Sequence, residues 1–212
     1  MDKIAKIKEW LGAGSINIFG LPMSGKDTVG VKLAEALGGK FLSSGLIIRT
    51  AAQEGRDGFS MTEYAKGGLT PSELFYSWIL PYFSLEELRP FPLVLSMVGR
   101  WSGEERAVME AAANGGHEMK AVLLLNISEA DVRGRFESVL ALGDRDKRAD
   151  DKSERIFTTR LEEFHEKVMP TVESYRQMGL IVPVQADGTR EEVFNRAVDK
   201  LYDFAIDKSP GV

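Results

Sequence analysis

Short apolar runs recur along the chain, and each is bounded by glycine, proline or polar residues. A strand of a parallel sheet that is covered on both faces shows such a continuous run, because neither side of it meets water. The runs predict five strands, at residues 16–19, 40–42, 92–98, 120–127 and 180–184.

Between these runs, apolar residues recur at the three- and four-residue spacing of an amphipathic helix. A further helix start is expected at residues 70–73, where threonine and proline precede serine and glutamate. The longest predicted helix is expected to kink at Pro170. Helices are predicted at about 2–11, 25–37, 46–53, 70–79, 104–113, 129–142, 153–178 and 190–206, with a helical turn at 61–66.

Strand and helix alternate five times, with no internal repeat and no linker. This alternation predicts an α/β fold, a doubly wound, five-stranded parallel sheet flanked by helices, within a single domain over residues 1–212. Ligands of such sheets bind at the carboxyl ends of the strands.

The first predicted strand runs directly into a glycine-bounded loop with the spacing G-x-x-x-x-G-K, from Gly20 to Lys26. Glycines allow successive backbone N–H groups to converge on an anion, and the following helix adds its positive end. The strict pattern has serine or threonine directly after lysine, whereas here Asp27 precedes Thr28. The alternative is a glycine- and proline-rich surface turn, which does not explain the lysine and the flanking strand and helix together. The predicted phosphate-binding residues are Gly20, Pro22, Ser24, Gly25, Lys26, Asp27 and Thr28.

Composition narrows the possible partners. The formal net charge of −5 argues against nonspecific binding to nucleic acid or to an anionic membrane. The absence of cysteine and the presence of two distant histidines, His117 and His165, argue against a thiolate or histidine metal centre, so no residue is predicted to ligate metal. No apolar run approaches the roughly 20 residues that span a bilayer. The chain is expected to be cytoplasmic and monomeric.

Several arginines follow predicted strands or lie in the charged stretch at residues 143–152. Each one alone could be a solvated helix residue. Together they fit a site that holds several phosphates, because phosphoryl transfer depends on positioning and charge neutralisation. They are Arg49, Arg100, Arg135, Arg145, Arg148 and Arg160.

These motifs resemble those of the adenylate kinase-like family of nucleoside monophosphate kinases, over nearly the whole chain. Residues 20–28 are similar to the P-loop sequence G-x-P-G-x-G-K-G-T of that family, including the proline and the threonine. Residues 43–49 resemble its S-T-G-D-x-x-R segment, residues 67–74 its G-x-x-V-x-D-E-L segment, and residues 148–151 the R-x-D-D of its lid.

The resemblance implies a P-loop fold with a monophosphate-binding insertion at residues 44–83 and a short lid at residues 143–152. It implies an ATP-dependent, magnesium-assisted kinase that phosphorylates a nucleoside monophosphate. The implied catalytic residues are Lys26, Arg100, Arg135, Arg148 and Arg160. The implied monophosphate-binding residues are Ser44, Arg49, Arg100 and Glu104.

The chain departs from the family pattern at several of these positions. Met23 and Asp27 replace loop glycines, and Val139 replaces an arginine expected on the lid side. Two carboxylates of the family are replaced by Leu46 and Ser96, of which the second helps to hold the water shell of magnesium in the family. A second hypothesis is therefore a catalytically weak, nucleotide-binding relative that acts by binding or by changing shape, and a third is a kinase for a different small acceptor.

Glu104 stands where the family has the glutamine that recognises adenine. A carboxylate only accepts hydrogen bonds, and guanine offers an amine and a ring N–H side by side. We therefore expect no strong preference for AMP over GMP. The alternative is that Glu104 caps the helix that begins near residue 102 and faces solvent.

Overall fold

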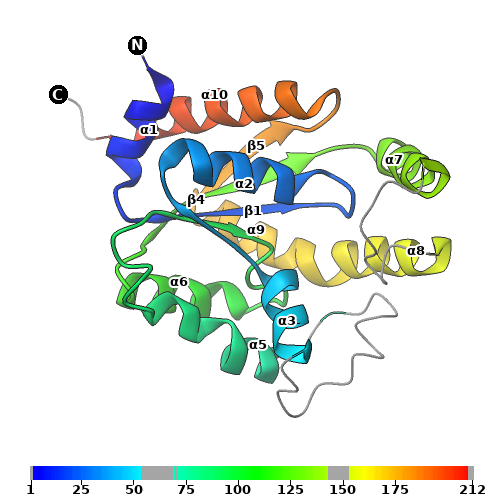
Figure 1. The fold of residues 1–212 in the computed structure, drawn as a ribbon, viewed down its shortest axis with the longest axis horizontal. Helices are drawn as coiled ribbons and strands as arrows, with labels where there is room; N and C mark the ends of the chain where they lie inside the picture. The colour runs from blue at the N-terminus through cyan, green and yellow to red at the C-terminus, as the bar shows by residue number, and fades with distance from the viewer. Residues whose placement is uncertain (1, 54–68, 70, 143–152, 210–212) are drawn as a thin grey trace.

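A computed structural model describes residues 2–53, 69, 71–142 and 153–209 of the chain. Its centre is a five-stranded parallel sheet in the order β2-β3-β1-β4-β5 (Figure 1). The strands are β1 (Ser15–Gly20), β2 (Lys40–Ser43), β3 (Leu93–Ser96), β4 (Met119–Asn126) and β5 (Ile181–Gln185). The predicted doubly wound sheet is confirmed.

Helices cover both faces of this sheet (Figure 1). One face carries α1 (Lys3–Leu11), α2 (Lys26–Leu37) and α10 (Arg190–Lys208). The other carries α6 (Glu104–Asn114), α8 (Glu154–Glu163), α9 (Met169–Gln177) and the 3-10 helix η1 (Leu80–Ser84). The remaining helices are α3 (Ser44–Gln53), α5 (Ser72–Trp78) and α7 (Glu129–Leu142).

Successive residues of a strand point to opposite faces, so each strand supplies both hydrophobic cores. Leu93 and Leu95 of β3 pack in the core beneath α6 and α9, whereas Val94 packs in the core beneath α2 and α10. Burial on both faces explains why these strands appear in the sequence as unbroken apolar runs.

The strand registers bring the ends of the three strands β1, β2 and β3 to one edge. Ser96 is the partner of Ile18 in β1 and of Ser43 in β2, and Gly20 is the partner of Leu125 in β4. The loops that leave β1, β2 and β3 therefore start next to one another.

The third strand is shorter than the predicted run at residues 92–98. Met97 has a φ of 55°, a left-handed backbone conformation that ends the extended chain directly after Ser96. Local apolarity could not indicate this turn, because Met97 and Val98 are buried like the strand itself.

The predicted long helix with a kink at Pro170 is divided into α8, a π-helical segment η3 (Phe164–Val168) and α9. Pro170 lies in the first turn of α9, two residues beyond the end of η3. Proline lacks an N–H group and its ring clashes with the carbonyl four residues earlier, so the preceding turn widens.

The predicted helical turn at 61–66 and the predicted lid at 143–152 lie outside the described residues, and so does much of the predicted insertion at 44–83. Within the described part of the chain, no helix is long and apolar enough to cross a membrane.

Gly30, in the interior of α2, allows this helix to pack closely on β2, because an added Cβ would overlap the Phe41 ring. We expect Gly30→Ala to lower the free energy of unfolding by about 1–3 kcal/mol, as overpacking does. Gly134, in the interior of α7, is the matched control, since no atom lies within 4 Å of its added Cβ. Gly134→Ala should leave stability unchanged or raise it by up to about 1 kcal/mol. Urea unfolding of both variants measures this difference, and equal effects would contradict the packing argument.

Candidate functional site

The loop between β1 and α2 closes tightly around its own backbone. Gly25, the N-cap of α2, has a φ of 90°, a conformation that favours glycine. Lys26 is the first residue of the helix, and its Nζ donates to the carbonyl oxygen of Leu21 at 3.2 Å. The lysine charge and the positive end of α2 thus lie at the same loop, as a phosphate-binding loop requires.

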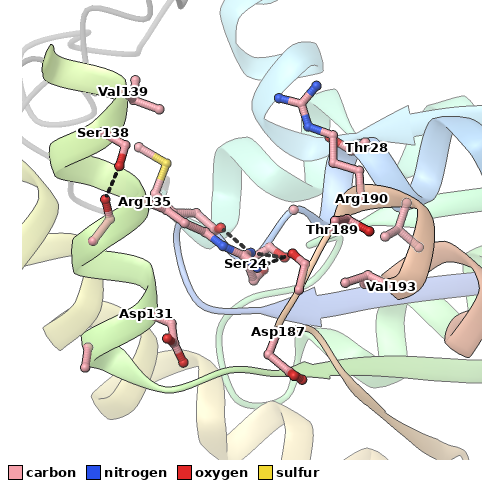
Figure 2. Close-up of a pocket in the computed structure, with 16 residues that line it drawn as sticks. Ser24, Thr28, Asp131, Arg135, Ser138, Val139, Asp187, Thr189, Arg190 and Val193 are labelled. Atoms are coloured by element: carbon pink, nitrogen blue, oxygen red, sulfur yellow. Dashed lines mark hydrogen bonds between the residues drawn. The ribbon is translucent and has the colours of Figure 1, made fainter. Parts of the chain in front are cut away.

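A cavity of about 740 Å³ opens beside this loop (Figure 2). Its walls come from the phosphate loop, from α7 and from the segment that joins β5 to α10. A volume of this size suits a nucleotide or another drug-sized ligand. The wall residues that bear polar side chains are Ser24, Thr28, Asp131, Arg135, Ser138, Asp187, Thr189 and Arg190.

Arg135 of α7 connects all three walls. Its Nη1 donates to the carbonyl oxygens of Met23 and Ser24, each at 3.3 Å (Figure 2). Its Nη2 donates to the carbonyl oxygen of Ala186 at 2.6 Å and to that of Gly188 at 3.4 Å. Arg135, one of the predicted catalytic residues, therefore lies at the phosphate loop, with its guanidinium bonded to the loop backbone.

A second group of predicted residues meets beyond the end of β3. Arg100 donates from Nη2 to Ser44 Oγ at 2.7 Å and from Nε to the carbonyl oxygen of Met97 at 3.3 Å. Ser44 Oγ in turn donates to the same carbonyl oxygen at 2.8 Å. The predicted monophosphate residues Ser44 and Arg100 are thus in direct contact, and both line a small cavity together with Phe75, Trp101 and Glu104.

The chain from Met97 to Trp101, which carries Arg100, is held from three directions. Asn17 of β1 donates from Nδ2 to the carbonyl oxygen of Val98 at 2.7 Å. Thr171 of α9 donates from Oγ1 to the carbonyl oxygen of Arg100 at 3.3 Å. The Glu104 carboxylate accepts from the N–H of Arg100 at 2.7 Å and from that of Trp101 at 3.1 Å.

Glu104 itself is 2% exposed, so its carboxylate depends on protein partners. One oxygen accepts the two backbone N–H groups just described, and the other accepts from Ser72 Oγ at 2.7 Å. The alternative was that Glu104 caps the helix and faces solvent. Its second part is wrong, because the carboxylate is buried against α5. Whether it contacts an acceptor base stays a prediction.

Beneath this segment, Tyr175 of α9 is fully buried and packs its ring against Phe19. Burial, together with the negative charge of Glu105, raises the pKa of the Tyr175 phenol well above its ordinary value. Tyr175 is therefore neutral over the whole physiological range and acts as part of the core.

No family model matches the chain. The adenylate kinase of Parasynechococcus marenigrum is 29% identical over 190 residues, which cover 86% of this chain and 95% of that protein. The adenylate kinase of Mycobacterium tuberculosis is 30% identical over 186 residues, which cover 87% of this chain and 97% of that protein. The chain belongs to the adenylate kinase family.

A solved gluconokinase from Sinorhizobium meliloti 1021 aligns with a TM-score of 0.58 and 21% identity, over 92% of this chain and 94% of that one. At this identity the likeness shows the fold alone, which is that of a P-loop kinase. Membership of the adenylate kinase family agrees with the resemblance found in the motifs, and supports a nucleotide kinase.

Two departures from the adenylate kinase pattern can be seen in the loop region. Met23, which replaces a glycine, has a φ of 65°, the left-handed conformation in which glycine carries no Cβ penalty. Asp27, which replaces another glycine, accepts a hydrogen bond from Ser96 Oγ at 2.6 Å. Leu46, at the position of a family carboxylate, is 52% exposed on α3.

The other predicted site residues lie on several elements of the fold. Gly20 ends β1, Pro22 is buried within the loop, and Arg49 lies half-buried on α3. Arg160 lies half-buried on α8, on the opposite side of the sheet from α2. Arg145 and Arg148 lie outside the described residues.

Sequence reasoning missed the segment from Asp187 to Arg190, which forms one wall of the large cavity. A signal was available, because this segment follows the fifth predicted strand and so must lie at the carboxyl edge of the sheet. Its Asp187 Oδ1 pairs with Arg196 Nη1 at 3.1 Å, which steadies the wall.

Glu104→Ala should destabilise the fold, because it leaves two backbone N–H groups and a serine hydroxyl without their acceptor. Each buried group left unsatisfied costs about 1–3 kcal/mol, so we expect the free energy of unfolding to fall by at least that amount. Glu110→Ala, an exposed site on the same helix, is the control and should change it by less than about 0.5 kcal/mol. Denaturant unfolding compares the two, and an equally small loss at both sites would show that the Glu104 hydrogen bonds contribute little.

Proposed function

We propose that the protein is an ATP-dependent nucleoside monophosphate kinase, which transfers the γ-phosphoryl group of ATP to a nucleoside monophosphate. The supporting observation is that the Lys26 loop follows β1 while Arg100 follows β3, the strand hydrogen-bonded to β1. Ser44, which accepts a hydrogen bond from Arg100, follows β2 on the other side of β3. Neighbouring strands lie about 4.8 Å apart, so a donor held by one loop and an acceptor held by the other can meet directly.

The residues act by positioning and by electrostatics. Lys26 and the N-terminus of α2 stabilise negative charge on the donor phosphates, including the charge that develops as the phosphoryl group is transferred. Arg100 holds the acceptor phosphate with a fork of donors. No general base is required, because a monophosphate oxygen is already nucleophilic.

Magnesium is the cation that such a reaction uses, and the side chains beside the loop suit it. The carboxylate of Asp27 and the hydroxyls of Thr28 and Ser96 are hard oxygen donors, the type that Mg²⁺ prefers. When bound, the ion supplies positive charge to the phosphate oxygens of the nucleotide.

Glu104 is the residue that bears on the choice of acceptor base. Its carboxylate lines the small cavity beside Arg100 and accepts hydrogen bonds only. Contact with a base would require the Ser72 hydroxyl to release its hydrogen bond to the carboxylate.

A coupled assay of ADP formation against AMP, GMP, CMP and UMP tests the proposal directly. Transfer to none of the four would reject it.

A catalytically weak nucleotide-binding protein is the second candidate, and one observation favours it. The Arg135 guanidinium is bonded to four backbone carbonyl oxygens, in the phosphate loop and in the segment that joins β5 to α10, which is a structural role. In that case ATP would bind tightly while ADP formation stayed at background with every monophosphate.

Lys26→Ala should lower the rate of phosphoryl transfer by orders of magnitude while the protein stays folded. The loss of one preorganised group of this kind costs about 3–4 kcal/mol in the transition state. Lys32→Ala is the control, since Lys32 lies on the same helix and pairs with Glu191 at the surface. Steady-state kinetics of both variants, with circular dichroism as a check of folding, measures the effect. A Lys26→Ala enzyme as fast as the Lys32→Ala enzyme would exclude Lys26 from the site.

Arg49→Ala and Arg100→Ala should mainly raise the Michaelis constant for the monophosphate, with a smaller change in that for ATP. Their contacts to the acceptor phosphate are made in the ground state as well as in the transition state. Arg106→Ala, at an exposed position on α6, is the control. If both variants weakened ATP alone, the donor and acceptor sides would have to be exchanged.

A further inference from the structure

The hydrogen bond between Ser96 and Asp27 joins the end of β3 to the first turn of α2. Ser96 Oγ donates to Asp27 Oδ1 at 2.6 Å, a short bond of the kind that hydroxyls form with ionised carboxylates. Ser96 is 1% exposed and Asp27 is half-buried, so the buried serine fixes the orientation of the carboxylate at the start of α2.

A carboxylate at this place is unfavourable for the bare nucleotide. Asp27 directly follows Lys26 in the loop that surrounds the donor phosphates, and like charges repel strongly in a partly buried site. A divalent cation between the carboxylate and the phosphates reverses the sign of this interaction, since it attracts both. Thr28, the next residue, adds a hydroxyl oxygen and lines the large cavity.

We propose that Asp27, positioned by Ser96, is the carboxylate that organises the divalent cation accompanying the donor nucleotide. One carboxylate together with substrate phosphates is a usual donor set for Mg²⁺, which keeps several of its waters. The inference rests on the proposed function, because the cation is the one that arrives with ATP.

The placement also explains two sequence departures together. The resembling family has glycine at the position of Asp27 and an acid at that of Ser96. Here the acid is Asp27, on α2, and the position at the end of β3 holds the smaller, uncharged Ser96, which is hydrogen-bonded to it. The negative charge is therefore kept at the site, but on α2 in place of β3.

A purely structural role is the competing explanation. Asp27 lies in the first turn of α2, where a negative charge stabilises the helix dipole. Such a role predicts a change in thermal stability on substitution, but no change in how nucleotide binding depends on the metal.

The first experiment measures ATP binding by titration calorimetry with and without Mg²⁺, on the full chain. For the wild type we expect Mg²⁺ to strengthen binding. In Asp27→Asn this metal-dependent gain should fall about tenfold or more, a change that roughly 1.4 kcal/mol of lost interaction produces. Metal-free ATP should bind as tightly as before or more tightly. Glu35→Gln, which removes an exposed charge from the other end of α2, is the control and should keep the gain.

Paramagnetic resonance of Mn²⁺ gives a readout that does not depend on turnover. With saturating ATP, wild type should immobilise the ion in a protein-bound complex, and Asp27→Asn should change its signal toward that of the free Mn²⁺–ATP complex. An unchanged signal together with an unchanged magnesium-dependent gain would overturn the inference.

The double variant Asp27→Ser with Ser96→Asp provides the decisive comparison. It keeps one carboxylate and one hydroxyl on the same two positions, and should recover most of the magnesium-dependent gain that Asp27→Ser alone loses. Failure of the folded double variant to recover the gain would count against the site.

If wild type transfers phosphoryl groups while Asp27→Asn keeps the full magnesium-dependent gain in ATP binding, this inference fails and the proposed function stands. If the gain depends on Asp27 but no monophosphate is phosphorylated, the proposed function fails and this inference stands.

Discussion

Parallel pairing of β1 with β3 is the constraint on which the site depends. Because the two strands run side by side and end together, the loops that leave them emerge at the same edge of the sheet. One loop brings Lys26 and the N-terminus of α2, and the other brings Arg100. A small displacement of either strand would separate Lys26 from Arg100. The packing of the two hydrophobic cores, which fixes the strands, therefore also fixes the distance between these two charged side chains.

Buried carboxylates near the start of α6 hold the acceptor side in place. Glu104 accepts the N–H groups of Arg100 and Trp101, and Glu105 accepts the N–H of Gly103 at 2.7 Å and the Ser174 hydroxyl at 2.8 Å. Charges are rarely buried unless they are fully hydrogen-bonded, and both carboxylates meet this condition. The same Glu104 also bonds to Ser72 of α5, so a helix within the predicted monophosphate-binding insertion is tied to the Arg100 segment.

The adenylate kinase family supplies the overall arrangement, and this chain varies it at the charged positions. The loop residues predicted to bind phosphate, Lys26 among them, are kept. The position of one carboxylate differs, and so does the residue that stands where the family recognises the base. These differences fall on the residues that would handle the metal and the base, and not on those that build the sheet. Membership of the family therefore determines the fold, but it does not determine which acceptor substrate is used.

The sequence by itself determined the layout of the fold and the place of the phosphate loop. Apolar runs, helical spacing and the Gly20–Lys26 pattern are local properties, decided by neighbours along the chain. Four of the five strands end within one residue of the predicted position, and β3 ends two residues before it. The tertiary structure alone decided the partners of the charged side chains. Asp27 meets Ser96 from 69 residues away, Glu104 meets Ser72 from 32, and Arg135 meets the carbonyl oxygen of Met23 from 112. A long polar side chain can reach several directions, and which one it takes depends on how the helices pack, a property that no local pattern contains.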